Sequence, residues 1–237
     1  MKIEIHPSKE RGSVDWGWLQ TQHSFSFGEY HRADRMGFGM LRVLNDDIIQ
    51  PSQGFPMHSH QNMEIVTLVL SGAIEHRDSM GNQDVISAGQ VQRMSAGKGV
   101  SHSEYNASDQ EPVRLLQIWI QTQARELDPS YEKKDMTKRV KKNEWLLVVA
   151  PENSSAVHIH QNVQFYLADA EQKQNLFFPL QATERGFYLY IIHGKIELQS
   201  HVLETGDAAA LSQLESVAFS VKENSKLLLI DTPLNGF

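Results

Sequence analysis

Short runs of apolar residues, either alternating with polar residues or continuous, make up most of the chain. In its first half they lie at residues 38–44, 64–70, 73–78, 84–86, 90–94 and 114–120. Residues 16–19 and 23–27 alternate aromatic with small or polar side chains, which predicts two further half-buried strands. Turn residues separate the runs, and many runs are rich in β-branched residues. The pattern predicts an all-β fold, a sandwich or small barrel, without βαβ units.

The second half repeats the pattern of the first. Residues 188–198 parallel 65–77, residues 206–211 parallel 89–94, and residues 227–231 parallel 115–120. Between the halves, residues 123–144 contain Pro129 and a basic cluster, which predicts a solvated connection. We therefore expect a first β-domain over residues 1–122, a linker over 123–144 and a second β-domain over 145–237.

Composition narrows the possible functions. The chain has 237 residues, a formal net charge of -7 and no cysteine, so disulfides, thiolate zinc sites and cysteine nucleophiles are excluded. Nucleic acid and anionic membranes are unfavourable partners for an acidic protein, and the basic cluster at 133–142 has no interleaved aromatic residues. No apolar run approaches the length of a membrane span, and the polar N-terminus lacks the apolar core of a signal peptide. We expect a cytoplasmic protein.

Two pairs of polar residues carry the candidate chemistry. They are His58 with His60, and His102 with Glu104, and each pair has the spacing i, i+2. On a strand, residues at this spacing leave the same face. If the two strands are neighbours, three imidazoles and one carboxylate converge. Such a set suits a divalent first-row transition metal with open coordination positions.

Several alternatives remain open on spacing alone. Glu64 has the same parity as His58 and His60, so strand parity cannot choose between Glu64 and Glu104 as the carboxylate ligand. Gln117 and Trp119 share one strand face, and the spacing does not say which.

Two other polar pairs predict no site. His158 and His160 also have ligand spacing, but no second ligand pair follows them, so we expect them to be structural or surface histidines. Asp46 and Asp47 follow the run 38–44 and predict a turn rather than an acid pair.

The residues around the two pairs resemble the cupin motifs. The first is Gly54-x3-His58-x-His60-x3-Glu64-x7-Gly72, and the second is Gly89-x7-Gly97-x-Gly99-x2-His102-x3-Asn106, with Ser95 in place of the usual Pro. More specifically, Gly17-Trp18-Leu19, Phe25-Ser26-Phe27, Leu41-Arg42-Val43-Leu44-Asn45, Asp78-Ser79-Met80-Gly81, Met94-Ser95-Ala96-Gly97 and His102-Ser103-Glu104-Tyr105-Asn106 are similar to the pirin family. The resemblance implies a bicupin of two antiparallel β-barrels. It also implies one metal in the N-terminal barrel, usually iron, held by His58, His60, His102 and Glu104.

The resemblance also implies an activity. Bacterial pirin-like proteins are similar to quercetin 2,3-dioxygenases, so we expect a flavonol-like substrate, dioxygen, ring opening and release of carbon monoxide, with Glu104 as the candidate base. Fe(II) is the expected metal, although Mn, Ni, Cu or Zn also suit the ligands. The alternatives are a metal-containing regulatory or redox-sensing protein without turnover, and a non-oxygenase cupin enzyme such as an isomerase. We expect a monomer, because two barrels in one chain can cover each other's apolar faces.

Overall fold

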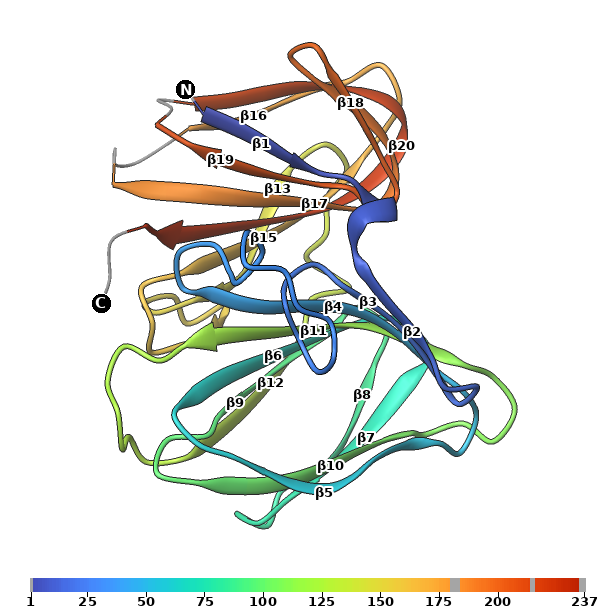
Figure 1. Cartoon of the computed structure of the whole chain (residues 1–237), viewed down its shortest axis with the longest axis vertical. Coiled ribbons are helices and arrows are strands. Elements are labelled where there is room, and N and C mark those ends of the chain that lie inside the picture. Colours follow the sequence, from blue (N-terminus) through green and yellow to red (C-terminus); the bar gives the residue numbers. More distant parts are fainter. Residues whose placement is uncertain (1, 180–183, 214–215, 235–237) are drawn as a thin grey trace.

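A computed structural model gives the fold for residues 2–179, 184–213 and 216–234. Within these residues the only helical element is a single 3₁₀ turn, η1 (Ser8–Glu10). Everything else with regular structure is β, arranged in two halves that lie one above the other in Figure 1. The prediction of an all-β fold is confirmed.

The first half contains a seven-stranded sheet and a four-stranded sheet. The larger sheet has the order β12-β9-β6-β11-β4-β3-β2, and the smaller has the order β5-β10-β7-β8. The larger comprises β2 (Gly12–Asp15), β3 (Leu19–His23), β4 (Leu41–Ile49), β6 (Met63–Ser71), β9 (Gln90–Ser95), β11 (Val113–Gln121) and β12 (Ser130–Asp135). The smaller comprises β5 (Gly54–His60), β7 (Ala73–Asp78), β8 (Gln83–Ser87) and β10 (Val100–Asn106).

The second half forms one nine-stranded sheet. Its main path has the order β1-β19-β17-β20-β15-β13-β14, while β16 pairs with β20 and β18 pairs with β17. The strands are β1 (Lys2–His6), β13 (Trp145–Ala150), β14 (Val157–His158), β15 (Gln164–Ala170), β16 (Asn175–Pro179), β17 (Arg185–Leu198), β18 (His201–Glu204), β19 (Ala208–Ser212) and β20 (Ser216–Pro233).

Each half is completed by a strand from outside its own run of sequence. β1 pairs with β19 in the second half, and the blue strand lies beside the orange and red strands in Figure 1. β12, within the stretch predicted as a linker, pairs with β9 at the edge of the first half. The two main sheets then have the same order, with β12-β9-β6-β11-β4-β3 matching β1-β19-β17-β20-β15-β13.

The two main sheets pack against each other through their apolar faces. Val66, Leu116 and Ile118 from the first half join Tyr188 and Leu228 from the second in one fully buried cluster. A second cluster fills the interior of the second half, with Leu189 and Leu229 at its centre. Side chains along each central strand therefore alternate: one points to the contact between the halves, and the next points into the interior of its own half.

Two local predictions were wrong. Residues 16–18 and 24–27 lie outside named strands, and only Leu19–His23 of that region forms one. The turn predicted at Asp46 and Asp47 is instead the middle of β4, which continues to Ile49. A run of three polar residues indicates a turn when one strand face is solvated, but here both faces of β4 are covered.

Candidate metal centre

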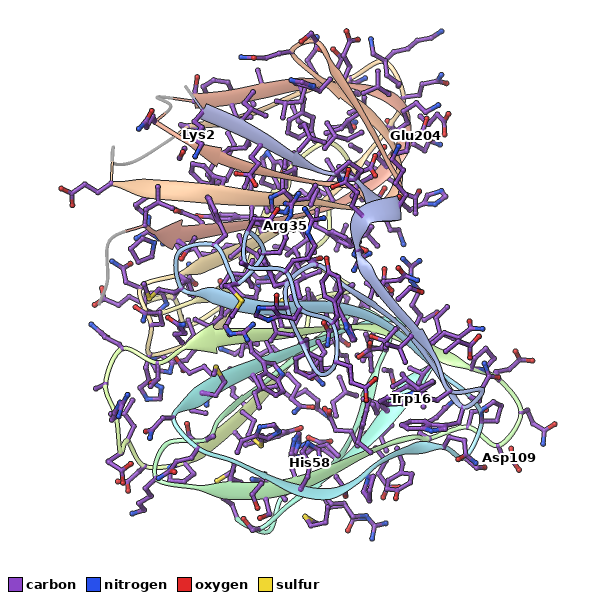
Figure 2. The ribbon with its side chains drawn as sticks, viewed as in Figure 1. Lys2, Trp16, Arg35, His58, Asp109 and Glu204 are labelled. Atoms are coloured by element: carbon purple, nitrogen blue, oxygen red, sulfur yellow. The ribbon has the colours of Figure 1, made fainter. Side chains whose placement is uncertain are left out.

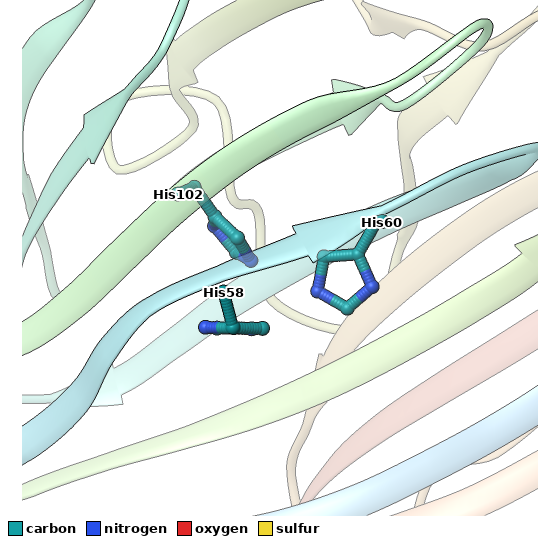
Figure 3. A group of neighbouring side chains, drawn as sticks. All are labelled: His58, His60 and His102. Atoms are coloured by element: carbon teal, nitrogen blue, oxygen red, sulfur yellow. The ribbon is translucent and has the colours of Figure 1, made fainter.

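The three histidines predicted as ligands lie together (Figure 3). β5 and β10 are antiparallel neighbours, and His58 lies opposite His102 in their register. The ring centroids are 4.5 Å apart for His58 and His102, 4.8 Å for His58 and His60, and 5.0 Å for His60 and His102. One nitrogen from each ring lies within 4.8 Å of the others. Figure 2 shows His58 in the lower half of the molecule, and its side chain is exposed, whereas His102 is buried.

Glu104 lies next to this histidine group and belongs to a second, overlapping group. Its carboxylate lies within 4.8 Å of a ring nitrogen of His102 and one of His76. A register shift between His102 and Glu104 separates the carboxylate from the β5 histidines, and Glu104 lies opposite His76 on β7. The four predicted ligands are therefore connected through His102, and His76 is an additional ring beside them.

Glu104 is held by residues of the facing sheet. Gln117 Nε2 donates a hydrogen bond of 2.8 Å to Glu104 Oε2, and Thr67 Oγ1 lies 3.3 Å from Glu104 Oε1. Burial raises the pKa of Glu104, while His76, His58 and the two hydrogen-bond donors act in the opposite direction. A buried carboxylate with fixed donors is a well-oriented acceptor for a metal or a proton.

A cavity of about 280 Å³ opens onto the histidines. Both Gln117 and Trp119 line it, so the face they share is the inner one. Phe27 and Phe55 form another part of the wall, and Phe27 packs edge-on against Trp119 with ring centroids 5.3 Å apart. The site combines metal-ligand groups with an aromatic enclosure, which suits a planar aromatic ligand.

A row of buried polar residues crosses the inner face of the seven-stranded sheet, opposite the strands that carry the histidines. Each member lies opposite the next in the strand registers, and the row runs through His23, Asn45, Gln117, Thr67 and Gln92. All five are at most 8% exposed. Gln92 Nε2 lies 3.3 Å from the ring of His76, and Gln117 and Thr67 contact Glu104. The row therefore supports the ligand groups from the opposite sheet.

The chemistry of the histidines fits a divalent metal. Nδ1 and Nε2 of His102 and Nε2 of His60 are buried without hydrogen-bond partners among the described residues. His58 Nδ1 lies 2.8 Å from the carbonyl of Pro56, which leaves its Nε2 available to bind a metal. Burial, with smaller effects of the neighbouring histidines, lowers the pKa of His102 to about 2 and that of His60 to about 4. Neutral imidazoles with free nitrogens are the form that binds metals.

Glu64 points away from these histidines. Its carboxylate accepts hydrogen bonds from the backbone N–H of His160 at 2.9 Å, the backbone N–H of Gln161 at 2.8 Å and Ser95 Oγ at 2.7 Å. It lies on the face of β6 that meets the second half, whereas the next residue, Ile65, lines the cavity. The parity it shares with His58 is reset by the turn at Asn62, whose φ is +52°.

His158 and His160 lie at the contact between the halves. Their rings are 4.9 Å apart, and His160 Nδ1 is 3.0 Å from Glu64 Oε1. Neither belongs to a group of three or more potential metal ligands within the described residues. Their i, i+2 spacing serves packing between the halves here.

Sequence reasoning missed His76, Asn45 and Asp47 as residues of this region. His76 is fully buried, lies 3.1 Å from Asp78 Oδ2 and stacks on Tyr131. Its i, i+2 spacing to Asp78 was the available signal. Asn45 and Asp47 have the same spacing and both line the cavity.

Sequence comparison relates nearly the whole chain to known protein families and to individual proteins. Residues 4–120 match the family Pirin, and residues 147–232 match a family described as the quercetinase C-terminal cupin domain. A protein of Escherichia coli K12 named quercetin 2,3-dioxygenase is 36% identical over 236 residues, covering 98% of this chain and 99% of that protein. A pirin-like protein of Caulobacter vibrioides is 34% identical over 231 residues, covering 97% and 99%.

Solved structures of bacterial proteins also match this chain over nearly its full length. The crystal structure of YhhW from Escherichia coli matches with a TM-score of 0.94 at 34% identity, covering 100% of both chains. A structure of the bacterial pirin YhhW in complex with nickel(II) matches with a TM-score of 0.93 at 35% identity, covering 99% of this chain and 100% of that one. No helix in the described ranges is long and apolar enough to cross a membrane. From its matched domains and full-length relatives, this chain belongs to the pirin family and folds as two cupin domains.

Proposed function

We propose that the protein is a metal-dependent dioxygenase that cleaves flavonols such as quercetin between C2 and C3 and releases carbon monoxide. The observation that carries this proposal is the convergence of three imidazoles with free nitrogens at one end of an aromatic cavity. The relative named quercetin 2,3-dioxygenase, which aligns over nearly the full chain, supports the choice of substrate class.

The metal would be held by His58, His60, His102 and Glu104, with Fe(II) as the expected ion. When bound, it supplies Lewis acidity toward the flavonol hydroxyl and a place for dioxygen. The neutral histidines and one carboxylate leave about one net positive charge with a divalent ion, which favours an anionic ligand.

Glu104 is the residue proposed to take the proton of the flavonol 3-hydroxyl. Its carboxylate lies within 4.8 Å of a ring nitrogen of His102, and burial raises its pKa, which makes it a better proton acceptor than an exposed glutamate. Gln117 orients it by donating to Oε2. Phe27, Phe55 and Trp119 would hold the planar substrate and exclude water.

The test is oxygen consumption with quercetin, combined with detection of carbon monoxide. Metal-stripped protein is reloaded separately with Fe²⁺, Mn²⁺, Ni²⁺, Cu²⁺ and Zn²⁺, and His58→Ala serves as the control. We expect uptake that follows one metal and disappears in the variant. A protein that binds one equivalent of metal tightly and consumes no oxygen with any of the five would overturn the proposal and favour a regulatory role.

Glu104→Gln tests the assignment of the base. The amide can still accept a hydrogen bond but cannot take a proton. We expect turnover to fall at least about 100-fold, within the usual contribution of general-base catalysis. Full turnover with full metal content would remove Glu104 from this role.

A further inference from the structure

A second, smaller cavity adjoins the one at the histidines. It measures about 130 Å³, against about 280 Å³ for the first. Both cavities are lined by Phe27, Asn45, Asp47 and Phe55, so these four residues stand at their junction. A cavity of roughly 150 Å³ is large enough for benzene, so the smaller one has the size of a single six-membered ring.

The junction carries polar groups without partners. Asp47 is 3% exposed, Asn45 4% and His23, which lines the smaller cavity, 4%. Asp47 Oδ1, Asn45 Oδ1 and His23 Nδ1 are all buried without a hydrogen-bond partner among the described residues. Buried polar groups without hydrogen-bond partners are unfavourable, so their presence on a cavity wall indicates a ligand that completes their hydrogen bonds.

The charges of these groups define the complementary chemistry. Burial raises the pKa of Asp47 to about 7, with the Thr21 hydroxyl acting against burial and with Asp46 and Glu104 adding to it. Burial and Arg11 lower the pKa of His23 to about 4, so its ring is neutral. Two carboxyl or amide oxygens that lack donors favour hydroxyl groups, and the aromatic walls favour a ring that carries them.

We infer that Asn45 and Asp47 form a subsite for a hydroxylated phenyl ring, next to the metal centre and in the smaller cavity. This inference rests on the proposed function for the orientation of the substrate. The flavonol would place its 3-hydroxyl at the histidines and its single phenyl ring between Phe27 and Phe55. Asn45 and Asp47 would then accept hydrogen bonds from the hydroxyls of that ring. The pair selects among substrates and takes no part in bond cleavage.

The test compares three flavonols that differ only on the phenyl ring. Quercetin carries two hydroxyls there, kaempferol one and galangin none. Binding is measured without oxygen by quenching of tryptophan fluorescence, in metal-loaded wild type and in Asp47→Asn. We expect wild type to bind quercetin about tenfold more tightly than galangin, with kaempferol between them. In Asp47→Asn the preference for quercetin falls about tenfold, while galangin affinity stays within about twofold.

A matched control is Asp46→Asn, the same change one residue earlier. Asp46 lies on the opposite face of β4, where its carboxylate binds Arg114 and Tyr190. Asp46→Asn destabilises the contact between the halves but leaves the preference among the three flavonols unchanged. If Asp46→Asn alters that preference as much as Asp47→Asn does, the effect comes from general loosening of the sheet and the inference fails.

The remaining outcomes separate this inference from the proposed function. Quercetin that binds with the expected preference but is not turned over supports the subsite and contradicts the oxygenase. Equal affinity of wild type for quercetin and galangin overturns the subsite and leaves the oxygenase standing. An equal loss of affinity for both flavonols in Asp47→Asn shows a structural role only. If none of the three flavonols binds saturably, both proposals fail.

Discussion

The main sheets of the two halves have the same strand order, but their inward-facing side chains are polar in the first half and mostly apolar in the second. In the first half the inward row across the sheet is polar and consists of His23, Asn45, Gln117, Thr67 and Gln92. At the matching positions of the second half the row consists of Leu147, Tyr166, Leu229, Leu189 and Ala209. Leu229, Leu189 and Ala209 are fully buried in an apolar core, and Tyr166 is partly buried and packs against it. One cupin therefore encloses a site, and the other is filled.

The strands that face the main sheet also differ between the two halves. In the first half a separate four-stranded sheet carries His58, His60, His102 and Glu104 and faces the polar row. In the second half the long strands β17 and β20 run on through irregular registers and join β16 and β18, so a single sheet encloses the core. A buried polar row is tolerated only where facing groups or a ligand complete its hydrogen bonds. The second half has an apolar interior and needs no such partners.

The sharpest test of the comparison is the pair His102→Ala and His158→Ala. Both remove a histidine from an i, i+2 pair, but only His102 lies in a ligand group. Removing a residue that only hydrogen-bonds to a metal ligand typically lowers metal affinity or activity by about 10–100-fold. We therefore expect His102→Ala, which removes a proposed ligand itself, to lower metal affinity and activity by more than about 100-fold. Metal content by mass spectrometry and oxygen uptake measure the effect.

His158→Ala should keep full metal content and activity. Metal loss in this variant would show that the second half contributes to metal binding, so that the two halves do not differ in this respect.

Asp47 and Ala168 occupy matching positions in the two halves. Asp47 pairs with Leu115 in the first half, and Ala168 pairs with Leu227 in the second. The first half therefore has a buried carboxyl group where the second half has a methyl group. Burial raises the pKa of Asp47 to about 7, whereas the unfolded chain has the ordinary value of about 3.9. Between these values the folded state keeps a proton that the unfolded state releases, so stability falls as pH rises. The penalty approaches about 4 kcal/mol above pH 7, at about 1.4 kcal/mol per pH unit.

Asp47→Asn removes this penalty. Urea unfolding of metal-free protein from pH 4 to pH 8 should show equal stability near pH 4 and a growing advantage of the variant above it. Parallel curves for variant and wild type would mean that Asp47 titrates normally in the folded state.

Leu229→Gln places the polar residue of the first half into the core of the second. Leu229 is fully buried, and its neighbours across the sheet are Leu189 and Tyr166. The amide would lose its hydration and find few partners, at a cost of about 3 kcal/mol. Urea unfolding gives this value, with Leu229→Met as the control for shape. A loss below about 1 kcal/mol would show that the second interior tolerates polarity after all.

Gln117→Leu is the reciprocal change and has the smallest effect. It removes the donor to Glu104 Oε2 but keeps an inward side chain of similar size. We expect a fall of about 10–100-fold in activity or metal affinity, the usual effect of losing a residue that orients a ligand. Gln117→Glu is a useful contrast, because it adds a second carboxyl beside Glu104 and should be worse. Unchanged activity in Gln117→Leu would show that the polar row is not needed by the site.

Sequence patterns predicted most strands of the first half because those strands have one clear period. Residues 73–78, 90–94 and 114–120 were predicted as strands and lie in β7, β9 and β11. The prediction failed at Asp46 and Asp47, because each of these carboxylates faces a different buried environment and the apolar alternation disappears. The pairing of β1 with the second half and of β12 with the first left no trace in the pattern, since local periodicity does not report which strand becomes the neighbour.

The amino-acid sequence alone showed the strand periods, the similar patterns of the two halves, and the two i, i+2 pairs that meet at the candidate metal centre. Tertiary structure alone decided that β5 and β10 are neighbours with His58 opposite His102, that Glu64 turns toward the second half, and that Asp47 faces the cavity. The physical reason is that a period of two states which residues share a face. Which face is inward, and what lies across from it, depends on strand pairing and on the packing of the two sheets.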